Sequence, residues 1–187
     1  MKKLFLLAFA LIQFGTPMFA QEKTEGVKWL SIEEAVALNK KNPKMIFVDF
    51  YTGWCGWCKR MDSQTFSNPV IVSLLNEHFY AVKFNAEGAE PITFKGQEYV
   101  NANAGQKRAT HDFAKAAAAV KRADGQSSIG YPTVSFFDKD LNLITPLPGF
   151  RSAKDFEAIL HFFIDEVYKT NSNLQQYIQQ FQGQVVE

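Results

Sequence analysis

The first strong patterns of apolar and polar residues predict a helix followed by a buried strand. Ser31 precedes Glu34 by three residues, which is the capping box of a helix that we expect to run to about Lys41. The nearly continuous apolar run over Met45–Tyr51 then predicts a strand whose two faces are both covered. Asp49 interrupts this run, so we expect a carboxyl group inside an otherwise apolar strand.

Later patterns predict a mixed sheet between helices, which is an α/β fold class. Asn68 and Pro69 supply the cap and the first position of a helix that ends near His78. Ser152 caps another helix, which we expect to continue to about Tyr168. Three further strands are predicted over Phe79–Asn85, Thr133–Phe137 and Leu143–Leu147. Helices and strands in this order are typical of a central mixed sheet flanked by helices.

The segment of about 87–129 is long for a connection, and we interpret it as an insertion before the strand at Thr133. Within it, Pro91–Val100 predicts a small hairpin, and apolar residues at helical spacing predict a helix over Gln106–Arg122. At the other end of the fold, residues 171–187 form a Gln-rich tail or a short helix.

The N-terminal residues 1–20 have the three-part pattern of a secretory signal peptide. Lys2 and Lys3 precede the apolar run Leu4–Ile12, and a small residue at Ala20 suits cleavage. The alternative is a buried N-terminal helix, since the run is about half of a membrane span. We expect residues 21–28 to be a flexible leader, and the mature protein to be exported, periplasmic or extracytoplasmic, without stable membrane insertion.

Composition and charge exclude several classes of protein. A chain of 187 residues that is 47% hydrophobic suits one globular domain and argues against disorder. Lys and Arg number 20 against 19 for Asp and Glu, so no basic excess indicates a nucleic-acid partner. The 18 phenylalanines predict a large core that does not depend on disulfides. A monomer without a cofactor is the default expectation.

Candidate chemistry lies in Cys55-Gly56-Trp57-Cys58, directly after the first strand and at the start of a helix. The free N–H groups and positive dipole end of a helix start favour a thiolate at Cys55. In such motifs the thiol pKa falls from about 8.5 to roughly 3.5–7.5. Cys58, three residues later, lies on the same helix face and within reach of a disulfide.

Two other interpretations of the cysteine pair remain open from the residues alone. The pair resembles half of a zinc site, but the chain has no third cysteine and its histidines are scattered, so we expect no metal. A permanent structural disulfide is the second alternative, although so short a loop constrains little of the unfolded chain.

The segment from Phe47 to Lys59 resembles the active site of the thioredoxin superfamily. More narrowly, it is similar to exported thioredoxin-like proteins of bacteria and to the C-terminal domain of the membrane thiol:disulfide interchange reductase. The resemblance extends through Tyr80–Asn85 and Gly130–Thr133. It implies a thioredoxin-like fold, which we assign to residues 29–170, with Pro132 in a cis peptide beside the disulfide.

The resemblance also implies catalytic roles. Cys55 would be the attacking thiolate and Cys58 the buried resolving thiol. The residue that matches Asp49 relays the proton of the resolving cysteine in thioredoxins, and a lysine that matches Lys83 lies near it. The alternative for Asp49 is a strand-end carboxylate with no role.

Substrate-binding residues follow from the same resemblance. Trp54, Gly56 and Trp57 surround the cysteines, and a cis Pro132 would expose the backbone of Tyr131 for strand-like pairing with a substrate. Two residues depart from the family pattern. Trp57 stands where thioredoxins have proline, and because the redox potential in this superfamily depends on the two residues between the cysteines, the motif does not set the direction of electron transfer. Tyr131 replaces a small or aliphatic residue, which would alter reactivity.

From these patterns we expect an exported thiol:disulfide oxidoreductase that acts as a reductant on protein disulfide substrates, with a membrane thiol reductase as electron donor. A disulfide oxidase or isomerase of the same fold is one alternative. A non-enzymatic thioredoxin-like adaptor or chaperone is the other, and it would retain function after Cys55→Ser.

Overall fold

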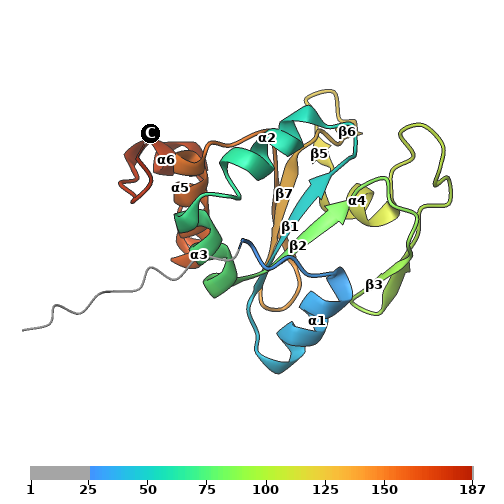
Figure 1. Cartoon of the computed structure of the whole chain (residues 1–187), viewed down its shortest axis with the longest axis horizontal. Coiled ribbons are helices and arrows are strands. Elements are labelled where there is room, and N and C mark those ends of the chain that lie inside the picture. Colours follow the sequence, from blue (N-terminus) through green and yellow to red (C-terminus); the bar gives the residue numbers. More distant parts are fainter. Residues whose placement is uncertain (1–25, 187) are drawn as a thin grey trace, which may run out of the picture.

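The computed structural model describes residues 26–186, which fold around a four-stranded sheet in the order β2-β1-β7-β8 (Figure 1). β1 (Met45–Tyr51) pairs in parallel with β2 (Phe79–Asn85) and antiparallel with β7 (Thr133–Phe137). β8 (Leu143–Pro148) completes one edge, antiparallel to β7. The predicted mixed sheet is confirmed, with β8 at the edge as its prolines favour.

Helices begin where the capping residues predict. In α1 (Ile32–Lys41) the amide of Glu34 donates to Ser31 Oγ at 3.1 Å, and the amide of Ser31 donates to Glu34 Oε2 at 2.8 Å. The Asn68 side chain caps α3 (Pro69–His78). On the same side as α3 lie α2 (Gly56–Gln64) and α5 (Ala153–Ile164), and α6 (Leu174–Gln180) packs against α5.

The two faces of the sheet carry separate cores, because successive side chains of a strand point to opposite faces. One face buries Phe47 and Phe136 against α2, α3 and α5. The other face buries Val48 and Phe50 against α1 and the insertion. Asp49 belongs by alternation to the face that holds Phe47, and this is the face that α2 covers.

The insertion adds two small hairpins and one short helix. β3 (Ile92–Phe94) pairs with β4 (Gln97–Tyr99), which confirms the predicted hairpin. β5 (Val120–Lys121) and β6 (Ser127–Ser128) form the second hairpin, and α4 (Asp112–Ala117) lies between the two. β3, β4 and α4 lie on the side of the sheet that α1 also covers (Figure 1).

Two helix predictions are wrong in extent. The helix expected over Gln106–Arg122 is limited to α4, because the His111 side chain caps it at Phe113 and the chain after it enters β5. The helix expected to reach Tyr168 ends at Ile164, because Glu166 adopts a left-handed backbone with φ 55°. A short 3₁₀ turn, η1 (Val167–Lys169), follows instead.

The predicted signal peptide at 1–20 and most of the predicted leader at 21–28 lie outside the described residues. Between residues 26 and 186, every helix is too short or too polar to cross a bilayer.

A candidate redox site at the start of helix α2

The cysteine pair lies where the chain leaves β1 and enters α2. Cys55 is the cap residue of this helix, with extended backbone, and its amide donates to the carbonyl of Thr52 at 3.1 Å. Cys55 Sγ accepts a hydrogen bond from the amide of Cys58 at 3.0 Å. A free amide of the helix start thus points at the sulfur, which favours negative charge on that atom.

The two cysteines are joined in a disulfide, with their Cα atoms 5.3 Å apart. Both side chains are buried, at 4% exposure for Cys55 and 3% for Cys58. Their closeness is set by the helix, since the residues are three positions apart on one face. The pair is therefore held ready for exchange between a dithiol and a disulfide with little backbone movement.

Asp49 is buried beneath this helix and forms an ion pair with the partly exposed Lys83. The two residues are register partners in β1 and β2, and Lys83 Nζ donates to Asp49 Oδ2 at 2.8 Å. Burial raises the pKa of Asp49 to about 6, because desolvation of the carboxylate outweighs the attraction of Lys83. Burial disfavours the charge of Lys83, but Asp49 and Asp62 outweigh burial and raise the pKa of its ammonium group.

Asp62 is a member of this cluster that sequence reasoning missed. Lys83 Nζ also donates to Asp62 Oδ1, so the lysine bridges two carboxylates. Asp62 follows Cys58 by four residues and shares its helix face. The bridge therefore places Asp49 under the face of α2 that carries Cys58. This four-residue spacing is the sequence signal that could have identified Asp62.

One carboxyl oxygen of Asp49, Oδ1, is buried and has no hydrogen-bond partner among the described residues. The other oxygen holds Lys83. A carboxyl group that is partly protonated near neutral pH, with one unengaged oxygen, is suited to accept a thiol proton.

An aromatic cage fixes the position of the Lys83 ammonium. The rings of Trp29, Tyr51 and Phe66 lie 5.1, 5.2 and 5.5 Å from Lys83 Nζ. Such contacts favour a cation that is removed from water. Trp29 was not among the predicted site residues, because it precedes the first helix and lies far from the motif in sequence.

Two exposed tryptophans border the cysteines. Trp54 and Trp57 are 57% and 54% exposed, which is unusual for such large apolar side chains. Trp57 lies against Phe150, with ring centroids 5.5 Å apart, and the guanidinium of Arg60 lies over both rings. Gly56, between the cysteines, is also exposed, and a side chain at this position would meet open space.

Tyr131 and Pro132 reach the same site from the loop before β7. The Tyr131–Pro132 peptide is cis, as the resemblance implies. The Tyr131 ring meets the Trp54 ring edge-on, with centroids 6.0 Å apart. The structure thus brings Tyr131 to the predicted site from a position far away in the sequence.

Comparison with known proteins agrees with this architecture. The family model described as a thioredoxin-like domain matches residues 32–164. A protein from Caenorhabditis elegans that is described only as uncharacterised is 25% identical over 170 residues, which cover 88% of this chain and 20% of that protein. The thiol:disulfide interchange protein DsbD of Vibrio vulnificus is 24% identical over 155 residues, which cover 79% of this chain and 22% of that protein.

The chain therefore spans about a fifth of the length of the curated relatives that it matches. Among solved structures, a thioredoxin-fold protein from Helicobacter pylori superposes with a TM-score of 0.53 at 21% identity. The match covers 74% of this chain and 84% of that protein, and it shows a shared fold.

Proposed function

The chain belongs to the thioredoxin-like domain family and carries the cysteine pair of a thiol:disulfide oxidoreductase, and on this premise we propose that it reduces disulfide bonds in exported polypeptides. The observation that carries the proposal is the amide of Cys58 donating to Cys55 Sγ at the start of α2, with Asp49 buried beneath the same helix.

The proposed reaction starts from the dithiol. The Cys55 thiolate attacks one sulfur of the substrate disulfide, the substrate S–S bond breaks, and one substrate sulfur leaves as a thiolate that takes a proton from water. A mixed disulfide between Cys55 and the substrate results. Cys58 then attacks Cys55 Sγ, the mixed disulfide breaks, and the second substrate sulfur leaves. Two electrons pass from the cysteine pair to the substrate.

Asp49 would serve the second step of this reaction. Cys58 is buried, so its thiol needs a base before it can attack. The unengaged Asp49 Oδ1 takes that proton, directly or through one water. Lys83 and Asp62 act as positioning residues. They hold the carboxyl group of Asp49 in place and shift its pKa without touching the reacting sulfurs.

The reducing direction is tested by the equilibrium of the Cys55–Cys58 pair with glutathione. A potential near about −270 mV is expected for a reductant. A value near about −120 mV would contradict the proposed direction and identify a disulfide oxidase instead.

Export and an electron donor complete the proposal. The similarity to DsbD and the sequence of residues 1–20 support an extracytoplasmic location, with a membrane thiol reductase that returns the Cys55–Cys58 disulfide to the dithiol. N-terminal sequencing of the protein recovered from outside the cytoplasm tests this, and we expect the mature chain to begin at Gln21. An intact Met1 would contradict cleavage.

A further inference from the structure

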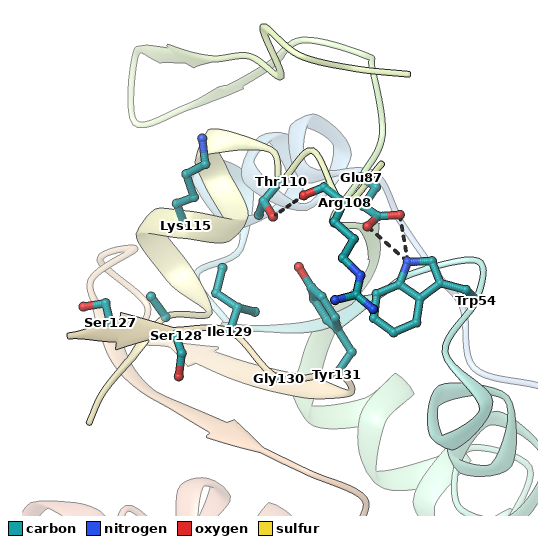
Figure 2. A pocket seen from close by; sticks show the side chains of 11 residues that line it. Trp54, Glu87, Arg108, Thr110, Lys115, Ser127, Ser128, Ile129, Gly130 and Tyr131 are labelled. Carbon is teal, nitrogen blue, oxygen red and sulfur yellow. Dashed lines mark hydrogen bonds between the residues drawn. The ribbon is translucent and has the colours of Figure 1, made fainter. Parts of the chain in front are cut away.

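A pocket opens beside the redox site, and the insertion builds most of it. The pocket has a volume of about 490 Å³, within the range of small-ligand sites. Trp54 and Tyr131 form one wall, and they directly precede Cys55 and Pro132 in the chain. Apart from Gly130, segment 87–129 contributes the rest, including Arg108 (Figure 2). A substrate held on Cys55 therefore has its neighbouring residues within reach of this pocket.

One hydrogen-bond donor of the pocket has no partner, and a second makes only a long hydrogen bond. The Tyr131 hydroxyl is buried and makes no hydrogen bond within the described chain, and its side chain points toward Thr110 in Figure 2. Thr110 Oγ1 donates a long hydrogen bond of 3.4 Å to the carbonyl of Arg108. Burial, together with the charge of Glu87, raises the pKa of Tyr131, so its hydroxyl remains a donor at neutral pH.

The pocket is lined by two cations, Arg108 and Lys115, and by one carboxylate, Glu87, whose negative charge the neutral indole of Trp54 does not cancel. Lys115 is paired with Asp112 at 2.8 Å, and Glu87 accepts from Trp54 Nε1 with both oxygens, at 3.1 and 3.0 Å. The Arg108 guanidinium lies over the Trp54 ring at 5.5 Å and makes no ion pair with any residue from 26 to 186. A planar guanidinium without an ion pair, beside the unpartnered hydroxyl of Tyr131, is an arrangement that suits a carboxylate ligand.

We propose that this pocket binds the side-chain carboxylate of an Asp or Glu that lies close to the disulfide in a substrate polypeptide, with Arg108 as its ion-pair partner. The inference rests on the proposed function, because the pocket is positioned to recognise a substrate only if Cys55 reacts with one. The insertion would then select substrates, and the preferred substrates would be polypeptides with an acidic residue beside the cysteine.

The experiment compares two series of disulfide-bonded peptides, identical except for Asp or Asn at each position flanking the cysteine. The reduced full chain should reduce the best Asp peptide about tenfold faster, as kcat/KM, than its Asn partner. This preference should weaken with added salt, because the ion pair is partly exposed. Arg108→Gln should bring the ratio close to one, and Arg108→Lys should restore part of it.

Arg122→Gln is the matched control. Arg122 is an exposed arginine of the same insertion that pairs with Asp124 at 3.9 Å and does not line the pocket. Replacing Arg122 should leave the ratio of kcat/KM for the Asp peptide to kcat/KM for the Asn peptide as it is in the unmodified protein. Because Arg108 and Arg122 are both exposed, neither change removes a buried group from the core.

Four outcomes would overturn the inference. Equal reduction of Asp and Asn peptides, or a preference that survives Arg108→Gln, would leave the oxidoreductase intact and remove the acidic-substrate assignment. A preference for oxidised glutathione over its neutral ester, without any peptide preference, would assign the pocket to a small disulfide instead. Reduction of neither peptide would overturn the proposed function, and this inference with it.

Discussion

Asp49 and Lys83 face each other across β1 and β2, and the 2.8 Å bond between their side chains lies beneath the helix that carries the cysteines. Because Asp62 of that helix reaches the same ammonium, the cluster joins sheet to helix below Cys58. The pairing of β1 with β2 therefore positions the charged groups that act on the Cys58 thiol. Changing the charge of Asp49 or Asp62 should alter both the reaction and the stability of the fold.

The first prediction concerns proton transfer. Asp49→Asn should slow the attack of Cys58 on a Cys55 mixed disulfide by about a hundredfold, because the base is lost. In the unmodified protein the rate of this step should rise with pH through about 6, the pKa of Asp49, and the variant should lack that inflection. Rapid-mixing measurements of substrate release test this, and equal rates in both proteins would remove Asp49 from the mechanism.

The second prediction concerns stability and pH. The folded protein holds the Asp49 proton up to about pH 6, whereas the unfolded chain releases it near 3.8. The folded state therefore binds more protons in this window, and the stability contributed by this group is lost as pH rises through it. Relative to Asp49→Asn, the unfolding free energy of the oxidised protein should fall by about 2 kcal/mol between pH 4 and 7. Denaturant titration at both pH values measures it, and parallel pH profiles would contradict the assignment.

The third prediction concerns Asp62. Its negative charge raises the pKa of Asp49, so Asp62→Asn should move the inflection in the Cys58 step to lower pH. The variant also leaves Lys83 paired with Asp49 alone, which further lowers the pKa of Asp49. Asp140→Asn, an exposed change in the turn before β8, is the control and should leave the inflection in place. An inflection that moves to higher pH would contradict this account of the cluster.

A fourth prediction concerns the exposed ring of Trp57. Trp57→Ala should raise KM for protein disulfides severalfold, because a substrate chain would cover this ring on binding. A small disulfide that does not reach the ring should show a weaker effect. Steady-state kinetics with both substrate types measure this difference. An equal rise in KM for both would contradict the prediction and indicate that Trp57 only maintains the shape of the site.

A fifth prediction tests the core that supports the site. Phe136 is fully buried and stacks on Phe163, with ring centroids 3.9 Å apart, while also touching Phe47 and Phe79. Phe136→Ala should lower the unfolding free energy by about 3–5 kcal/mol. Phe150→Ala, at a partly exposed position, should cost less. Denaturant titration compares the two variants, and equal losses would contradict this placement of the core.

Much of the fold could be predicted because local signals agree with the final structure. The capping box at Ser31 and the apolar run of β1 each fix an element without help from distant residues. The extent of α4 could not be predicted in this way. An alanine-rich stretch favours a helix, but the buried His111 side chain caps α4 at its start and the pairing of β5 with β6 ends it.

The candidate site likewise has one part that the local sequence predicts and one part that depends on distant contacts. The residues around Cys55 are contiguous, so the motif itself identifies them. Asp62 and Trp29 join the site only through Lys83, and Arg108 reaches Trp54 only after the insertion has folded back on the sheet. Contacts of this kind depend on the register of strands and the path of long loops, which no local pattern records.

The central claim is that Cys55 is held as a thiolate at the start of α2, and the pH dependence of its alkylation tests this most directly. In the reduced Cys58→Ser variant, Cys55 should react with iodoacetamide with a midpoint below about pH 7.5. A midpoint near about 8.5, the value of free cysteine, or a thiol that does not react in the folded protein, would contradict the account.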